Sequence, residues 1–217
     1  MAYNNILFFD LETTGLDYEN DRIIEFGAVL VDAKTNKVLK THSVFVNAGK
    51  FIPPVVENLT GISNDDIKQE GITESALVEL IKPYFNDDTL LVAYNIHFDI
   101  NFMYYLLKRF DINLEQPNVL DMLTVYRERH SYPHKLSHAI EQYNIDVKPT
   151  HRSLDDTEAM VKLYHLMKPE FANIDHFINK VCFVQKYGLK GKQFSNIRYV
   201  PFNFKLNTVA NELNTTM

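Results

Sequence analysis

The chain has 217 residues, 46% of them hydrophobic, and a formal net charge of −6. This length suffices for one hydrophobic core, or for one domain with an extension. The longest apolar runs are too short to span a membrane, the N-terminus has no secretory pattern, and the single cysteine, Cys182, excludes an internal disulfide and a cysteine metal site. We therefore expect an intracellular, cytoplasmic protein without a membrane partner.

The charges are distributed unevenly. Residues 176–205 carry six basic side chains and no Asp or Glu, whereas residues 1–175 contain 27 acidic and 16 basic residues, a balance of −11. An acidic front suits a protein that collects divalent cations, and a basic tail suits one that also meets polyphosphate.

Apolar periodicity predicts the secondary structure in chain order. Strands are expected over residues 5–10, 22–31 and 38–46, joined by short links as an antiparallel meander. Short helices follow over 55–59 and 73–85, then a strand over 90–94, a helix over 99–110, a strand and helix within 119–129, and helices over 136–143 and 154–167. This order predicts an α/β fold with a mixed sheet flanked by helices. Pro169 marks the expected end of this domain, residues 1–169, and residues 170–217 form an extension of unknown role.

Asp10 and Glu12 end the first predicted strand. Side chains two residues apart on a strand point to the same side, so two carboxylates lie together at the end of a buried strand. Their mutual repulsion calls for a compensating charge, and a divalent cation is the simplest one. A polar strand end entering a turn is the alternative interpretation.

Asp99 and Asp156 each head the apolar stripe of a helix, with buried residues expected at offsets of 3, 4, 7 and 11. The alternative for Asp99 is an acid favoured by the helix dipole. The alternative for Asp156 is a capping box formed by residues 153–156 (SLDD). His151 precedes the second helix and has a pKa range suited to a general base, although an ordinary loop histidine fits the same position.

Together, these residues describe four acids and a base that surround two Mg²⁺ or Mn²⁺ ions about 3.5–4 Å apart, an arrangement that cleaves phosphodiesters. The oxygen-only ligand set favours these ions over Zn²⁺.

Three segments resemble the motifs of the DnaQ-like, or DEDDh, 3′–5′ exonuclease family, which includes the proofreading subunit or domain of bacterial DNA polymerase III. The first is FFDLETTG at residues 8–15, the second is AYNIHFD at 93–99, and the third is His151 followed by Asp156. Weaker similarities are IIEFGA at 23–28, LTGI at 59–62, VLD at 119–121 and KL at 135–136. The resemblance covers residues 5–168, with the motifs in the family's order.

The resemblance implies a ribonuclease H-like fold with a central mixed five-stranded sheet, and release of nucleoside 5′-monophosphates from a 3′ end. It implies that Asp10, Glu12 and Asp156 hold one metal ion, that Asp10 and Asp99 serve a second, and that His151 is the general base. The residues that it places around the terminal nucleotide are Thr13, Thr14, Gly15, Tyr94, Asn95, Phe98 and Phe102. Tyr94 stands where proofreading members frequently have histidine, a departure that bears on the choice of substrate, since an aromatic ring can still stack on a base.

Lysines and aromatic residues alternate in residues 176–205, a combination that serves single-strand binding. Two alternatives stay open: a segment whose rings pack on the domain, and a docking segment for a polymerase or another protein.

Three functions are consistent with the whole sequence. The first is a DNA exonuclease of replication or repair that prefers single-stranded or frayed 3′ ends. The second is an RNA exonuclease with the same site, because the contacts that recognise a 2′-hydroxyl leave no sequence pattern here. The third is a non-enzymatic nucleic-acid- or polymerase-binding module, whose expected sign is a missing acid or histidine, and all five are present.

Overall fold

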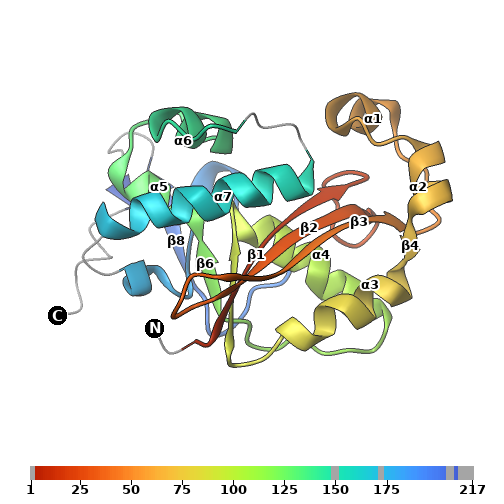
Figure 1. Ribbon diagram of the computed structural model, residues 1–217, viewed down its shortest axis with the longest axis horizontal. Helices are drawn as coiled ribbons and strands as arrows, with labels where there is room; N and C mark the ends of the chain where they lie inside the picture. The colour runs from red at the N-terminus through yellow and green to blue at the C-terminus, as the bar shows by residue number, and fades with distance from the viewer. Residues whose placement is uncertain (1–2, 148–151, 171–173, 204–207, 210–217) are drawn as a thin grey trace.

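The computed structural model describes residues 3–147, 152–170, 174–203 and 208–209. Its main sheet has the strand order β4-β3-β2-β1-β5-β6 (Figure 1). The strands are β1 (Asn5–Thr13), β2 (Ile23–Asp32), β3 (Val38–Asn47), β4 (Ile72–Thr73), β5 (Thr89–Ala93) and β6 (Val119–Asp121). Strands β1, β2 and β3 form the predicted antiparallel meander, whereas β4, β5 and β6 pair in parallel with their neighbours. The predicted α/β class with a mixed sheet is therefore confirmed.

The sheet has one strand more than the five that were expected. Strand β4 has only two residues and pairs with Val46 and Asn47 at the end of β3. Two residues are too few to produce a visible alternation of polar and apolar positions. The preceding helix α2 (Asn64–Glu70) was also not predicted, although Ser63 and Asp66 form a capping box at its start.

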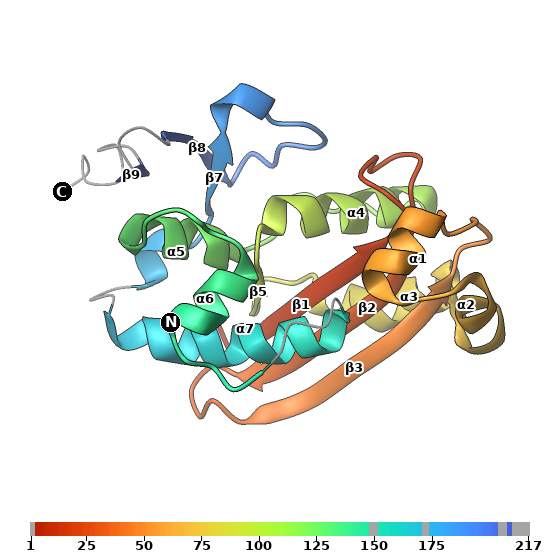
Figure 2. The same ribbon diagram turned by 90° about the horizontal axis from the view of Figure 1, so that it is seen from above.

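Helices cover both faces of the sheet. Figure 2 shows α7 (Ser153–Met167) along one face and α4 (Ile96–Arg109) along the other, with β1 and β2 between them. The remaining helices are α1 (Pro54–Thr60), α3 (Glu74–Ile81), α5 (Met122–Arg129) and α6 (Leu136–Gln142). The 3₁₀ turns are η1 (Lys82–Tyr84), η2 (Lys168–Glu170), η3 (Ile174–Phe177) and η4 (Gln185–Tyr187).

Strand β1 divides the hydrophobic core into two halves. Its even-numbered residues Ile6 and Phe8 pack with α7, where the Phe8 and Tyr164 ring centroids are 5.2 Å apart. Its odd-numbered residues Leu7 and Phe9 pack with residues of α3 and α4. Each such buried side chain contributes about 1.5–3 kcal/mol to stability. The same alternation directs the even-numbered acids at the end of β1 toward the α7 face.

The described part of the C-terminal extension packs on this domain. Strands β7 (Lys180–Val184), β8 (Arg198–Asn203) and β9 (Thr208–Val209) form a second sheet in that order. Val181, Phe194 and Ile197 belong to the same core cluster as the odd-numbered residues of β1. Asn179 joins the extension to β6, because its backbone N–H donates to the Val119 carbonyl (2.8 Å) and its side-chain oxygen accepts from the Val119 N–H (2.8 Å). A boundary at residue 169 stays a prediction.

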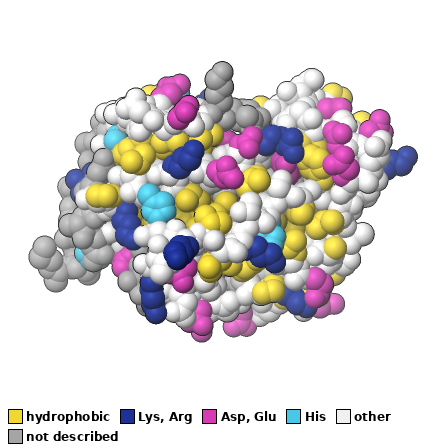
Figure 3. Space-filling view, in the orientation of Figure 1, with side chains coloured by type: hydrophobic (Ala, Val, Ile, Leu, Met, Phe, Trp, Pro, Cys, Tyr) yellow, Lys and Arg dark blue, Asp and Glu magenta, His cyan; other side chains and the backbone are white. Residues whose placement is uncertain are grey.

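The surface in the view of Figure 1 carries interspersed charges. Figure 3 shows acidic, basic and apolar side chains mixed over this face, so the acidic excess of residues 1–175 does not give the face a single sign. None of the helices in the described ranges has both the length and the apolar character needed to cross a lipid bilayer.

Candidate active site

Three carboxylates meet where β1 passes the start of α7. Among the described residues, Asp10, Glu12 and Asp156 each offer an oxygen, and these oxygens lie within 4.8 Å of one another. The period of two along β1 brings Asp10 and Glu12 to the α7 face, and Asp156 lies in the first turn of α7. The predicted convergence of the strand acids with the α7 acid is therefore present in the fold.

Asp99 reaches the same place from the opposite helix. The chain leaves β5, turns at Asn95 in a left-handed conformation (φ 71°), and begins α4, whose first turn carries Asp99. The side chain of Asp99 is 2% exposed. It lines a cleft of about 470 Å³ together with Asp10, Leu11, Glu12, Tyr94, Phe98, Lys135, Leu136, Ser137 and Asp156. The strand and two helices thus bring all four predicted acids to one cleft.

Burial and mutual repulsion make Asp10, Glu12 and Asp99 weak acids in the absence of a cation. Burial raises the pKa of Asp10 well above its ordinary value, and the charges of Asp99, Glu12 and Asp156 raise it further. Burial also raises the pKa of Asp99 well above the usual range. The pKa of Glu12 rises to about 8 through burial and the charges of Asp156 and Glu25, against the opposing charge of Arg152. Such a group of acids requires protons or cations to offset its charge.

A buried carboxylate on β2, Glu25, holds the start of α7. Glu25 is 1% exposed and accepts hydrogen bonds from the Ser153 backbone N–H (2.9 Å) and from Arg152 Nε (3.0 Å). Arg152 Nη2 completes the ion pair at 2.8 Å. The capping-box interpretation of residues 153–156 is therefore wrong: Arg152 is the N-cap and makes no side-chain cap bond, and the first helical N–H of Ser153 binds Glu25 instead.

The backbone of β2 lies directly against α7. A Cβ atom added at Gly27 would lie 2.3 Å from the Leu154 nitrogen and the Ser153 carbonyl carbon, so only glycine permits this approach. The Thr157 hydroxyl lies at this contact: it donates to the Ser153 carbonyl at 2.6 Å, and the Gly27 carbonyl is 3.2 Å from the same Oγ1. The segment IIEFGA, a weak similarity in sequence, thus supplies the two β2 residues that position Asp156.

Another buried carboxylate, Asp121, has the corresponding role for α4. Asp121 is fully buried at the end of β6, and its Oδ1 accepts from the backbone N–H groups of Asn95 (2.9 Å) and Ile96 (3.2 Å). Its Oδ2 accepts from the Thr124 hydroxyl at 2.5 Å. These bonds fix the turn that precedes Asp99. In the sequence, VLD is only a weak family similarity that indicates no role for Asp121.

The threonines and the glycine after the β1 acids form a fixed loop. Thr13 Oγ1 donates to the Gly15 carbonyl (2.6 Å), and Thr14 Oγ1 donates to Asp21 Oδ1 (2.9 Å). A Cβ at Gly15 would lie 2.3 Å from the Asp21 carboxylate. The backbone of this loop is held close to the acids, and neither hydroxyl is directed by these bonds into the cleft.

Only some of the residues that were expected around the terminal nucleotide line the cleft. Tyr94 and Phe98 line the cleft, and the Tyr94 hydroxyl donates to the His134 carbonyl at 2.9 Å. Asn95 is exposed at the start of α4, where its left-handed turn positions the helix. Phe102 is 2% exposed and packs behind Phe98 with ring centroids 4.9 Å apart, so it supports the cleft wall. Lys135, Leu136 and Ser137 also line the cleft, and the first two form only a weak family similarity in the sequence.

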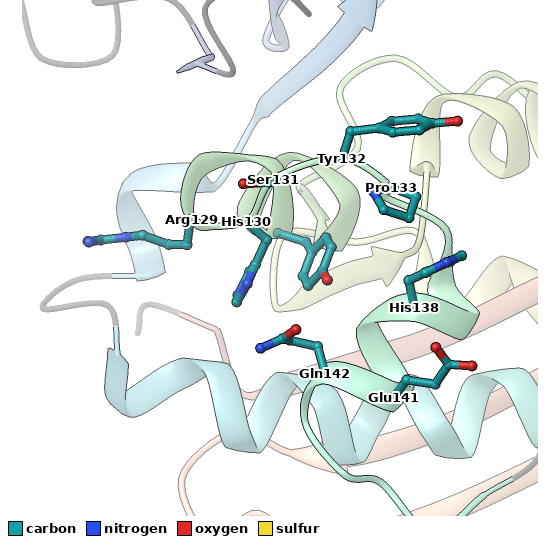
Figure 4. Close-up of a pocket in the computed structure, with 9 residues that line it drawn as sticks. Arg129, His130, Ser131, Tyr132, Pro133, His138, Glu141 and Gln142 are labelled. Carbon is teal, nitrogen blue, oxygen red and sulfur yellow. The ribbon is translucent and has the colours of Figure 1, made fainter.

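His151, the predicted general base, lies outside the described residues. Two other histidines, His130 just after α5 and His138 within α6, lie away from the acids. His130 and His138 line a separate, polar pocket of about 540 Å³ together with Tyr132 and Glu141, as Figure 4 shows. His130 Nε2 is hydrogen-bonded to the Tyr143 hydroxyl at 2.9 Å. Neither histidine lines the acid cleft.

The model of the exonuclease family (RNase_T) matches residues 7–164, which include Asp10, Glu12, Asp99 and Asp156. The chain belongs to this exonuclease family. The predicted membership in the DnaQ-like exonuclease family is thereby confirmed.

Similar proteins are much longer than this exonuclease-family chain. The PolC-type DNA polymerase III of Caldanaerobacter subterraneus is 32% identical over 170 residues, which make up 76% of this chain and 12% of the polymerase. The 3′-5′ exonuclease DinG of Bacillus subtilis is 32% identical over 163 residues, covering 73% of this chain and 17% of DinG. The DinG of Staphylococcus haemolyticus is 26% identical and matches 100% of this chain but 23% of its own length. The chain spans less than a quarter of each of these relatives.

Solved structures confirm the fold. The chain resembles the exonuclease I of E. coli in its zinc-bound complex with single-stranded DNA, with a TM-score of 0.71, 21% identity, and coverage of 80% of this chain and 42% of that chain. A second structure of exonuclease I has a TM-score of 0.69 and 22% identity, covering 76% and 41% of the two chains. The exonuclease-family chain therefore has the ribonuclease H-like fold that its motifs implied.

Proposed function

We propose that this chain is a divalent-metal-dependent 3′–5′ exonuclease that prefers the 3′ ends of single-stranded or frayed DNA and releases nucleoside 5′-monophosphates. The observation that carries the proposal is the cluster of Asp10, Glu12 and Asp156, whose oxygens lie within 4.8 Å, with Asp99 in the same cleft. The family match supports the reaction class, and the relatives named as 3′-5′ exonucleases support the direction. The E. coli exonuclease I complex with single-stranded DNA supports the substrate.

The residues present fit a pair of hard divalent cations. All four side chains offer carboxylate oxygens, the ligand type that Mg²⁺ and Mn²⁺ prefer. Burial raises the pKa of Asp10 and Asp99 well above their ordinary values, so positive charge is required before both can ionise. When bound, two Mg²⁺ or Mn²⁺ ions supply Lewis-acid stabilisation to the attacking and leaving oxygens of a phosphodiester.

The family resemblance assigns the carboxylates to the two ions. Asp10, Glu12 and Asp156 would hold one ion, and Asp10 together with Asp99 would hold the other. Glu25 keeps Asp156 in position through the first turn of α7. The rigid attachment of both helices allows the acids to keep their separation without rearrangement, which is what a preorganised site requires.

His151 is the proposed general base. It takes a proton from the attacking water, since an imidazole has a pKa near the working pH. Arg152, the next residue, is fixed to Glu25 by its ion pair. The same ion pair holds the start of α7, and with it Asp156, beside the strand acids.

The terminal nucleotide is expected to occupy the cleft of about 470 Å³, a volume within the range of small-ligand sites. Backbone groups of Thr13, Thr14 and Gly15 would approach the sugar and phosphate, since the loop is fixed by its own hydrogen bonds. Tyr94 and Phe98 offer ring surface to the base. A polymerase or another protein partner for residues 170–217, and a cytoplasmic location, stay predictions.

The proposal is tested by digesting 5′-labelled single-stranded DNA, duplex DNA and RNA with Mg²⁺, with Mn²⁺ and with EDTA. A ladder that shortens from the 3′ end only when metal is present, and fastest on single-stranded DNA, is expected. Asp10→Asn should abolish the ladder, whereas Asp87→Asn, a change of an exposed aspartate outside the cleft, should leave it intact. A faster ladder on RNA would identify an RNA exonuclease instead, and intact substrate with every metal would favour a binding module.

A further inference from the structure

A second hollow lies beside the acid cleft and includes the C-terminal extension in its wall. It has a volume of about 580 Å³ and is lined by Leu16, Tyr18 and Glu19 from the loop after β1, by Tyr105 of α4, and by Lys190 and Gly191 of the extension. Leu16 is 82% exposed. Three segments that are far apart in the sequence thus form one concave surface, which we call the outer hollow.

The extension loop is firmly attached to α4 at this place. Asn101 is fully buried and accepts from the Lys192 backbone N–H through Oδ1 (2.6 Å), while His97 Nε2 is hydrogen-bonded to the Lys190 carbonyl (2.7 Å). Gly191 lies between these residues at φ +80°, and a Cβ there would lie 2.2 Å from the Asn101 side-chain oxygen and 2.8 Å from the Tyr18 ring. The loop that carries Lys190 and Gly191 is therefore a fixed part of the wall of the hollow.

The outer hollow is continuous with the proposed path of the substrate. Leu16 directly follows the loop of Thr13, Thr14 and Gly15. Tyr18 contacts Phe98 edge-on with ring centroids 6.0 Å apart, and Phe98 lines the acid cleft. Phe98 and Tyr18 therefore form one aromatic wall between the two cavities, along which a strand leaving the acid cleft would reach the outer hollow.

The hollow offers ring surfaces to a planar ligand. The rings of Tyr18 and Tyr105 are nearly parallel, with an angle of 7° between their planes and centroids 6.4 Å apart. Tyr18 is held in this orientation by edge contacts to Phe102 at 5.3 Å and to His97 at 6.5 Å. Fixed aromatic faces bind nucleobases of any sequence, since every base has a π-face.

The charges of the hollow favour an uncharged base in the interior and a phosphate at the rim. Asp21 is paired with Lys50 at 2.7 Å, and Asp17 accepts from the backbone N–H groups of Glu19 (3.0 Å) and Asn20 (3.1 Å). Both acids thus have partners within the protein, but their negative charge still repels phosphate from the interior of the hollow. Lys190 is exposed at the rim and is the cation among the lining residues. An uncharged base inside, with its phosphate beside Lys190, matches this arrangement.

We propose that the outer hollow binds an unpaired nucleobase of the strand whose 3′ end occupies the acid cleft. Tyr18 and Tyr105 contact the base, and Lys190 contacts the backbone phosphate. The extension is therefore part of the substrate-binding surface. This inference rests on the proposed function, because the strand is placed by the 3′ end that the acid cleft receives.

The test compares two substrates in the full chain. A p-nitrophenyl ester of thymidine 5′-monophosphate fills only the terminal position, and a single-stranded octanucleotide also reaches the outer hollow. Tyr105→Ala should raise KM for the octanucleotide about tenfold relative to the ester, because one stacked base is lost. Lys190→Ala should lower the slope of log binding constant against log salt by about 0.7. The matched controls are Tyr187→Ala and Lys186→Ala, which change exposed residues of the extension outside the hollow.

The inference would be overturned by two results together. The ratio of the octanucleotide KM to the ester KM would be the same in Tyr105→Ala and wild type, and the salt slope of Lys190→Ala would equal that of wild type. Thermal unfolding of each variant shows whether a loss reflects misfolding, and the exposed Lys190 provides a variant without that risk. If the wild type cleaves neither substrate, the proposed function fails. Octanucleotide binding measured by fluorescence anisotropy then tests the outer hollow separately from cleavage. Weaker binding by Tyr105→Ala than by wild type supports it, and equal binding overturns it.

Discussion

Glu25 of β2 and Arg152 at the start of α7, 127 residues apart in the sequence, form an ion pair beside the acid cluster, in which the carboxylate is buried and the guanidinium is partly exposed. Glu25 is also the cross-strand partner of Glu12. The pair therefore connects the position of one helix to the strand that carries two of the acids. Glu25 is therefore a positioning residue. It binds the Ser153 N–H in the same helical turn as Asp156, and it is not one of the three clustered acids.

Replacing Glu25 tests this role. Glu25→Ala leaves the Ser153 N–H and the Arg152 guanidinium without their acceptor, and we expect a loss of about 1–3 kcal/mol of stability. The movement of α7 should weaken Mg²⁺ binding as well. Calorimetric unfolding and Mg²⁺ titration measure both effects.

Glu25→Gln keeps one carbonyl oxygen for the Ser153 N–H and should restore most of the Mg²⁺ affinity. Glu115→Ala, at an exposed position, serves as the matched control. Unchanged Mg²⁺ affinity in Glu25→Ala, together with normal stability, would remove Glu25 from the site.

The raised pKa values predict how stability depends on pH. In the metal-free protein the folded pKa of Glu12, about 8, exceeds the unfolded value of about 4.3. The folded state therefore binds the proton more tightly, and this contribution to stability is complete below the unfolded pKa and is lost as pH rises toward 8. We expect the Tm in EDTA to fall between about pH 5 and pH 8.5, and the Tm increase caused by Mg²⁺ to grow over the same interval.

Asp10→Asn provides the control for that experiment. It removes one charge from the cluster, so the Tm in EDTA should depend less on pH and should be higher than that of the wild type at pH 8. A Mg²⁺-induced Tm shift that is the same at every pH, or a lower Tm for Asp10→Asn at pH 8, would show that the acids do not repel one another as inferred.

Removal of the proposed base should change the rate and its pH dependence together. His151→Ala is expected to lower kcat about 10²- to 10⁴-fold. The wild-type rate should fall as pH decreases through the imidazole pKa, and the variant should lack that dependence. His176→Ala, at an exposed histidine, is the matched control. The same pH profile in His151→Ala and wild type would exclude His151 as the base.

The extension should contribute to stability through its buried aromatic residue. Phe194 is 2% exposed and belongs to the main core cluster, with its ring 5.9 Å from that of Tyr104. Phe194→Ala should cost about 3–5 kcal/mol, whereas Tyr187→Ala, at a position 69% exposed, should cost little. Denaturant unfolding measures both. Equal stabilities would mean that the extension folds independently of the core.

Local sequence patterns were sufficient where the relevant residues are close in the chain. The alternation along β1 placed Asp10 and Glu12 on one side, and helical spacing placed Asp156 at the head of the buried α7 stripe. These periods carry the orientation of each side chain, so the convergence of the acids followed once strand and helix were recognised.

The remaining features depend on contacts between distant segments. The bond from Ser153 to Glu25 spans 128 residues, and because Glu25 takes that N–H, the local capping box does not form. The buried Asp121 accepts bonds from a loop 25 and 26 residues earlier. The outer hollow needs Gly191 against Asn101, which no periodicity indicates.

Removal of the 3′-terminal nucleotide in the four-acid cleft can be followed by single-turnover digestion of a 3′-labelled single-stranded oligonucleotide. The wild type with Mg²⁺ should release the whole label as mononucleotide in the first step, and Asp156→Asn should reduce that rate at least about a thousandfold, as expected for loss of an essential group. Asp155→Asn, the neighbouring change, should remain active. Labelled products longer than one nucleotide, or full activity in Asp156→Asn, would show that the four-acid cleft does not remove the terminal nucleotide.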